Sequence, residues 1–161
     1  MKKTFSLILL FCFLTVFSQK LVWKEGTKLN WSLFKSPENK MKSDSTIVSY
    51  SSCGLSYTAF KDKANNKMKV RIDATFDPSK SWKHPIKTKN LNINHEQGHF
   101  DIAEIYARKL RKEFLENVKT EKDYQLKFKL IYQECMVNFS IIKTIMITLP
   151  NEELMQKNKM S

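Results

Sequence analysis

The hydrophobic pattern changes its period just past the midpoint of the chain, and this change constrains the fold more than any other feature. Residues 67–76 alternate between apolar and polar side chains, which is typical of an antiparallel strand with one buried face. We also expect a short strand over 28–34 and two strand halves over 46–60, separated by a bulge or bend at Cys53-Gly54.

After residue 88 the apolar residues recur at intervals of three and four, as on an amphipathic helix. The stripe of the first helix consists of Ile102, Ala103, Tyr106, Leu110 and Phe114. A second helix is predicted to begin near Thr120, an N-cap candidate with Asp123 at the capping-box spacing. Its apolar face consists of Tyr124, Phe128, Ile131, Tyr132 and Cys135. Strands followed by helices predict an α+β fold, a small antiparallel sheet followed by two long helices.

The start of the chain predicts export. Lys2 and Lys3 precede an almost wholly apolar run of about 13 residues, 5–17, which is shorter than the roughly 20 that a membrane-spanning helix needs. We therefore expect a signal peptide over 1–18, a secreted or periplasmic location, and no stable membrane span after cleavage. An uncleaved anchor is the alternative.

Composition fits one domain, which we place at 19–149, followed by a polar tail over 150–161. The 28 Lys and Arg residues exceed the 16 Asp and Glu residues, which gives a formal charge of +12. Such a charge favours either anionic cell-envelope partners or simply a well-solvated surface. The lysines are scattered, so no nucleic-acid partner is expected. The oligomeric state is not predicted.

Two cysteines, Cys53 and Cys135, remain once the signal peptide is removed. An exported compartment permits a disulfide between them. Two separate buried thiols are the equally weighted alternative.

The segment His95-Glu96-Gln97-Gly98-His99 matches H-E-x-x-H, the zincin signature. Side chains four apart on a helix lie on one face, so both imidazoles can reach one tetrahedral Zn²⁺. The glutamate between them lies close to a metal-bound water and can act as general base and then general acid. A glycine inside a helix costs about 1 kcal/mol relative to alanine, which is tolerable where another group must approach the backbone.

The alternative for the two histidines is a hydrogen-bonded pair in a metal-free core. They extend the apolar stripe of the first helix, so in either case they face the domain interior.

Around this motif the chain resembles the bacterial family called domain of unknown function 922, whose members are described as secreted zinc-dependent proteases. The resemblance is strongest over 81–111 and extends more loosely back to 29–31 and 53–57 and forward to about Glu134. It rests on Ser81-Trp82, Leu91 and the run His95-Glu96-Gln97-Gly98-His99-Phe100-Asp101-Ile102-Ala103-Glu104. It implies a zincin-like domain with a zinc-protease role.

A catalytic zinc of this type takes three protein ligands and a water, and the sequence shows two. Asp101 and Glu104 point away from the first histidine on the helix, so we expect structural roles for them, such as pairing with Arg108. His84 and Glu134 are the other candidates. A loop histidine and a solvated carboxylate are the alternatives for these two.

Family members continue to a Tyr-Asp-rich segment containing a histidine, but this chain has no histidine after His99. The apolar, β-branched run 136–149 shows no family likeness. A frameshift near Cys135 is one hypothesis; the other is a native segment and a site without its third ligand.

The predicted function is an exported zinc-dependent metallopeptidase that hydrolyses peptide bonds of a peptide or protein substrate with a metal-bound water. His95 and His99 are the predicted metal ligands, Glu96 the catalytic residue and Zn²⁺ the cofactor. The alternatives are a non-catalytic zinc-binding or cell-envelope interaction module and a metal-free structural domain.

Overall fold

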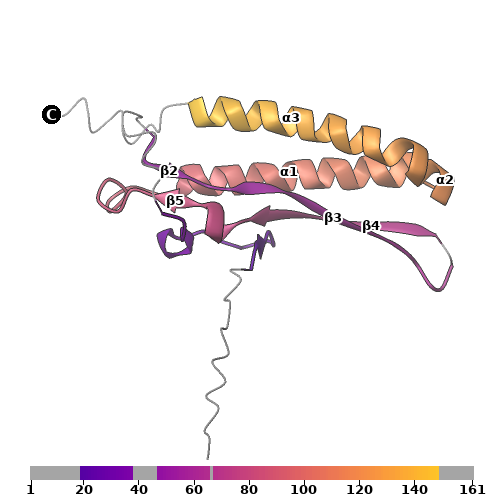
Figure 1. Cartoon of the computed structure of the whole chain (residues 1–161), viewed down its shortest axis with the longest axis horizontal. Coiled ribbons are helices and arrows are strands. Elements are labelled where there is room, and N and C mark those ends of the chain that lie inside the picture. The colour runs from indigo at the N-terminus through magenta and orange to yellow at the C-terminus, as the bar shows by residue number, and fades with distance from the viewer. Residues whose placement is uncertain (1–18, 38–46, 66, 149–161) are drawn as a thin grey trace, which may run out of the picture.

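The computed structural model describes residues 19–37, 47–65 and 67–148. The expected signal peptide, 1–18, and the tail, 150–161, lie outside these ranges. Within them the chain has an α+β fold with small antiparallel sheets and long helices (Figure 1). The predicted fold class is confirmed at this level.

The strands form two antiparallel sheets. The larger has the strand order β1-β4-β3, formed by β1 (Leu21–Val22), β4 (Met68–Phe76) and β3 (Cys53–Lys61). The smaller pairs β2 (Ser49–Tyr50) with β5 (Trp82–Lys83). The sequence pattern did not reveal β1 and β5, because strands of two residues are too short to show an alternation.

The strand predicted over 67–76 is confirmed as β4. Ile72, Ala74 and Phe76 are buried in the core, whereas Lys69 and Arg71, at the alternate positions earlier in the strand, are exposed. The strand pairs along its whole length with β3, from Cys53 opposite Phe76 to the hairpin end. It ends at Asp77, whose carboxylate accepts the Ser79 backbone N–H at 3.0 Å in the 3₁₀ turn η3 (Pro78–Lys80).

The two strand halves predicted over 46–60 are present as β2 and β3, but the break lies at Ser51-Ser52 and not at Cys53-Gly54. The Cys53 N–H donates to the Ser51 carbonyl at 3.1 Å, and the Ser52 N–H donates to Ser81 Oγ at 2.9 Å. These bonds direct the chain from the small sheet into the large one.

The strand predicted over 28–34 is wrong, because this segment contains the 3₁₀ turn η1 (Trp31–Leu33). Asn30 caps the turn by accepting the Ser32 N–H at 3.0 Å. The Leu29 N–H donates to the side chain of Gln97 at 2.8 Å instead of to a neighbouring strand. Side-chain acceptors therefore replace the backbone partners that a strand would have needed.

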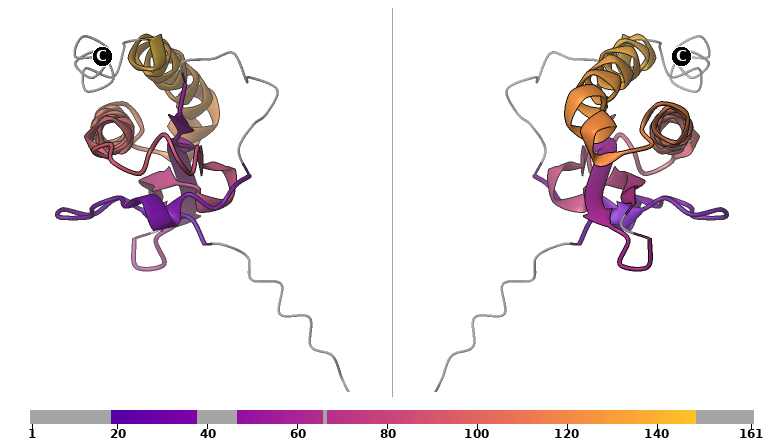
Figure 2. Two further views of the ribbon diagram at one scale, coloured as in Figure 1. Left: turned by 90° about the vertical axis from the view of Figure 1, so that its left-hand side faces the viewer. Right: turned by 90° about the vertical axis from the view of Figure 1, so that its right-hand side faces the viewer.

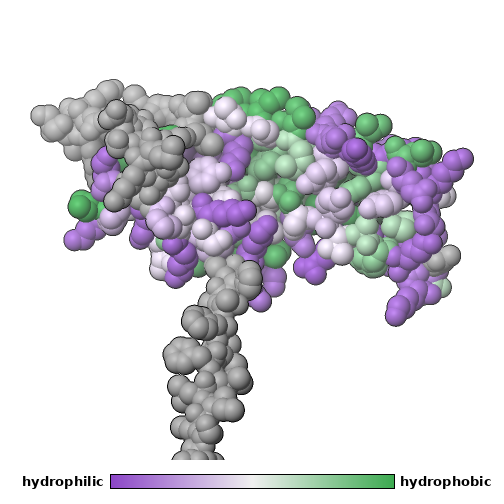
Figure 3. Space-filling view, viewed as in Figure 1, coloured by the Kyte–Doolittle hydropathy of each residue, from purple (hydrophilic) through white to green (hydrophobic). Residues whose placement is uncertain are grey.

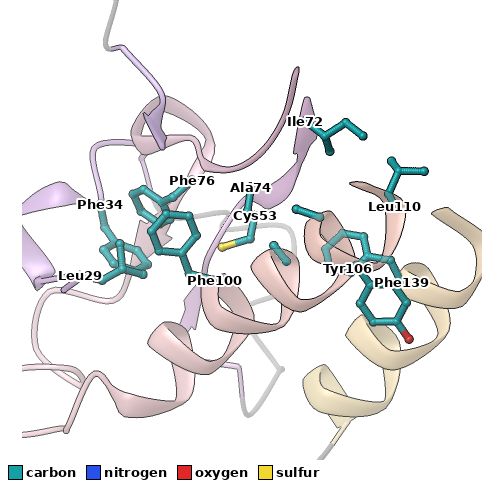
Figure 4. Close-up of a cluster of buried hydrophobic side chains, with 12 residues drawn as sticks. Leu29, Phe34, Cys53, Ile72, Ala74, Phe76, Phe100, Tyr106, Leu110 and Phe139 are labelled. Carbon is teal, nitrogen blue, oxygen red and sulfur yellow. The ribbon is translucent and has the colours of Figure 1, made fainter. Parts of the chain in front are cut away.

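Helix α1 (Asn94–Asn117) lies across the large sheet and forms the centre of the domain. Viewed end-on in Figure 2, α1, the last helix and the large sheet surround a common core, and Tyr57 of β3 contacts Tyr132 of the last helix with ring centroids 5.0 Å apart. The inward face of α1 packs on β3 and β4 (Figure 4), and the cluster includes Leu29, Phe34, Cys53, Ile72, Ala74, Phe76, Phe100, Ala103, Tyr106, Ala107, Leu110 and Phe139.

The second helical segment begins as predicted. Thr120 accepts the Asp123 N–H at 3.1 Å, and the Asp123 carboxylate accepts the Thr120 N–H at 3.1 Å, which is a complete capping box. The segment consists of α2 (Glu121–Asp123), the π-helical turn η4 (Tyr124–Phe128) and α3 (Lys129–Thr148).

The apolar run after Cys135 is helical and belongs to α3. Phe139 is buried against Tyr106 of α1, with ring centroids 5.5 Å apart, while Val137 and Ile141 face outward. Apolar side chains accordingly gather on the outer surface of α3 (Figure 3). No helix in the described ranges is both long enough and apolar enough to cross a membrane.

Phe76 and Phe60 offer a matched test of this core. Phe76 is 0% exposed and Phe60 is 48% exposed on the neighbouring strand. We expect Phe76→Ala to lower the free energy of unfolding by about 3–5 kcal/mol, through lost burial and a cavity, and Phe60→Ala by less than about 1 kcal/mol. Urea unfolding of the full chain measures both. Equal losses would contradict the described packing.

Candidate metal centre

The candidate site lies at the N-terminal end of α1. The helix begins at Asn94, so the motif predicted to bind metal occupies its first turns. Glu96 is the acidic residue of the first turn, where the helix dipole stabilises a negative charge. The Gln97 side chain bonds Leu29 and Asp101, which fixes this end of the helix against the N-terminal segment.

The two histidines of the motif lie side by side. Their ring centroids are 4.9 Å apart, with the ring planes at 89°. Two imidazoles that share one tetrahedral zinc, with Zn–N bonds of about 2.0–2.1 Å, have centroids about 5 Å apart. His95 is half-buried and His99 is buried. The spacing of the two rings therefore fits a shared ion.

His99 carries a buried nitrogen without a partner. In the part of the chain that the structure describes, Nδ1 has no hydrogen-bond partner. Burial lowers the pKa of this imidazole to about 4; the Glu96 carboxylate opposes the shift, and the charges of His95 and Lys143 add to it. His99 is thus neutral at pH 7, which is the form that binds a metal.

The Glu96 carboxylate is buried and held on one side. Its Oε1 accepts a hydrogen bond from Ser49 Oγ at 2.6 Å, across from β2. Its Oε2 is buried and has no hydrogen-bond partner among the described residues. A carboxylate with one oxygen fixed and the other free is suited to accept a proton.

A lysine that the sequence analysis did not single out extends from α3 to the β2–β3 segment. Lys143 Nζ lies 3.3 Å from the Cys53 carbonyl oxygen and 3.4 Å from the Tyr50 hydroxyl. One signal for it was present: Lys143 is the only charged residue in the run 136–149. A single charge in an otherwise uncharged, largely apolar run of residues is expected to have a specific partner or to face solvent.

The glycine of the motif is where α3 approaches α1. A Cβ atom at Gly98 would lie 3.2 Å from Met146 Cε. A close approach to the helix backbone was expected at this glycine, and Met146 is the group that makes it.

Within the described ranges, no third ligand lies with the two histidines. Among residues 19–37, 47–65 and 67–148, no three His, Cys, Asp or Glu side chains form a group suited to hold a metal ion. His84 Nδ1 accepts the backbone N–H groups of Ile86 and Lys87 at 3.2 and 3.1 Å, so this lone pair is engaged in its own loop.

Glu134 is exposed on α3 and distant from the motif along the helix axis. Its neighbour Cys135 contacts the Tyr106 carbonyl oxygen at 3.6 Å. Tyr106 lies about 10 Å along α1 from His99, at 1.5 Å per residue. Glu134 therefore lies in the half of the α1–α3 pair that is farther from the two histidines.

The remaining acids of the motif region have structural partners. Asp101 accepts hydrogen bonds from the Trp23 indole and the Gln97 amide, both at 2.8 Å. Glu104 accepts bonds from Arg108 at 2.9 Å, as predicted, and from Arg111 at 2.6 Å.

Cys53 and Cys135 are free thiols, so the disulfide alternative is not realised in this structure. Cys53 is buried beneath the site, and burial raises the pKa of its thiol to about 12. It is therefore protonated and does not serve as a thiolate ligand at neutral pH.

The neutral state of His99 gives the zinc-free protein a pH-dependent stability. Unfolded His99 binds a proton below about pH 6.5, whereas the folded form does so only near pH 4. The free energy of unfolding should therefore fall as the pH is lowered from 6.5 towards 4, by up to about 3 kcal/mol from this group. Urea unfolding at several pH values, with His99→Gln as the control, measures it. An unchanged pH slope in His99→Gln would contradict this prediction.

No protein family model, no curated protein and no solved structure matches this chain. The resemblance to domain of unknown function 922 therefore stays a prediction based on the quoted residues. Any function of this chain must therefore be argued from its own residues.

Proposed function

We propose that this chain is an exported zinc-dependent metallopeptidase of the zincin type, related to domain of unknown function 922, which acts on a peptide or protein substrate. The observation that carries the proposal is the pair of neighbouring imidazoles, 4.9 Å apart, beside a buried carboxylate. His95 and His99 would hold the ion. Zinc at this position supplies a Lewis acid and lowers the pKa of bound water towards 7.

Glu96 performs the proton transfers in this proposal. Its free oxygen, Oε2, accepts a proton from the water as the water oxygen bonds to the substrate carbonyl carbon. The same proton then passes to the amide nitrogen as the C–N bond breaks. Ser49 donates to Oε1 and holds the carboxylate in one orientation during both transfers.

A non-catalytic zinc-binding or cell-envelope module is the second candidate. The specific observation in its favour is the two-histidine set without a third ligand in the described ranges. In such a module the ion would stabilise the N-terminal end of α1 without supporting turnover. The two candidates therefore differ in catalysis and agree in zinc binding.

Replacing Glu96 separates them. In the metallopeptidase, Glu96→Gln keeps the size of the side chain and the zinc but loses the proton acceptor, so peptide hydrolysis should fall at least about 100-fold. Elemental analysis of the purified full chain should show the same zinc content as in the unmodified protein. Digestion of a mixed peptide library, followed by mass spectrometry, measures the activity.

Glu116→Gln is the matched control, because Glu116 is exposed on the same helix and pairs only with Lys112 in the described structure. It should cleave at the unmodified rate. Chelator-sensitive cleavage that survives in Glu96→Gln would refute the role of Glu96. Bound zinc with no cleavage of any peptide by the unmodified protein would favour the non-catalytic module.

A further inference from the structure

Lys143 lies on the side of α3 that faces the motif. Met146, one helical turn further along α3, is the group nearest to a Cβ at Gly98, at 3.2 Å. Lys143 itself is half-buried, unlike Lys129 at the start of the same helix, which is exposed. The ammonium group is therefore directed inward, toward the β2–β3 segment, by the packing of α3 on α1.

The charge of Lys143 has neutral neighbours. Its Nζ lies 3.3 Å from the Cys53 carbonyl oxygen, 3.4 Å from the Tyr50 hydroxyl and 5.3 Å from the centroid of the Tyr50 ring. Both oxygen contacts are longer than the usual 2.7–3.2 Å of such bonds. No carboxylate within the described ranges forms an ion pair with this ammonium, whereas Lys61, Lys69 and Lys127 each have one.

One short strand connects this ammonium to the proposed general base. Tyr50, which contacts Lys143, follows Ser49, which donates to Glu96 Oε1 at 2.6 Å. Met146, one turn from Lys143, packs next to Gly98 of the motif, so the ammonium group lies at the motif end of the α1–α3 pair.

We propose that Lys143 is a specificity residue that binds a carboxylate of the substrate close to the bond that is cleaved. This inference rests on the proposed peptidase function. A half-buried cation without an anionic partner favours an anion over a neutral group, and a charge-assisted hydrogen bond is about twice as strong as a neutral one. The formal charge, which is +12 for the whole chain and +10 without Lys2 and Lys3 of the expected signal peptide, steers anionic peptides towards the domain. The carboxylate belongs either to an acidic side chain or to the C-terminus of the peptide.

Binding to the Glu96→Gln variant tests this without interference from turnover. Three acetylated hexapeptides of otherwise equal sequence serve as probes: one with a central Glu and an amidated end, one with Gln and a free carboxyl end, and one with Gln and an amidated end. Titration calorimetry with the zinc-loaded full chain should give at least tenfold tighter binding for one of the two carboxylate peptides than for the neutral peptide. The tighter of the two identifies the source of the carboxylate.

Adding Lys143→Gln should abolish this tenfold preference, which corresponds to 1.4 kcal/mol. Lys143→Arg should retain it, and Lys129→Gln on the exposed side of α3 should leave it unchanged. Equal binding of the three peptides, no binding of any, or a preference that survives in Lys143→Gln would overturn the proposal.

Turnover by the unmodified protein distinguishes failure of this inference from failure of the proposed function. Cleavage of all three peptides with equal kcat/KM contradicts the role of Lys143 and leaves the peptidase intact. Carboxylate-selective binding that depends on Lys143 but is never accompanied by cleavage contradicts the proposed peptidase function. The assignment of Lys143 as an anion-binding residue then still holds.

Discussion

The burial of polar side chains at the start of α1 is the constraint on which the rest of the structure depends. Glu96, Gln97 and His99 are each less than one-tenth exposed, although a buried polar atom without a partner costs about 1–3 kcal/mol. The side-chain atoms of Gln97 have hydrogen-bond partners in the protein. Glu96 Oε2 and His99 Nδ1 do not, among the described residues. The packing of the surrounding apolar core offsets this free-energy cost. A ligand that paired with these two atoms would remove the cost and would bind correspondingly more tightly.

The orientation of α1 follows from contacts at both ends. Near its start, Trp23 donates to Asp101 and the Leu29 N–H donates to Gln97, so the N-terminal segment is fastened to the helix. Further along, Arg111 donates to the Ile72 carbonyl at 2.6 Å while it pairs with Glu104. These bonds hold the helix against β4 and fix the direction in which the two histidines point. The site is thus placed by groups that take no part in its chemistry.

The sequence alone was sufficient to predict those secondary-structure elements that depend only on a few neighbouring residues. The alternation of β4 and the capping box of Thr120 and Asp123 follow from backbone geometry over a few residues, and both are present. The segment 28–34 was misassigned because its outcome depends on Gln97, which is 68 positions from Leu29. Within the site, helical spacing placed His95 and His99 together. Ser49 could not be predicted, because tertiary packing brings it to Glu96 from β2. Lys143 is the single charge of the run 136–149, but its contact with Tyr50 depends on the packing of α3 and could not be predicted either.

X-ray absorption at the zinc edge of the zinc-loaded full chain tests the central claim most directly, since it measures the ligands themselves. Two imidazole ligands at about 2.0–2.1 Å are expected, with oxygen donors completing the shell. The imidazole signal should halve in His99→Ala. A zinc site without imidazole scattering, or a signal that His99→Ala leaves unchanged, would contradict the shared-ion geometry.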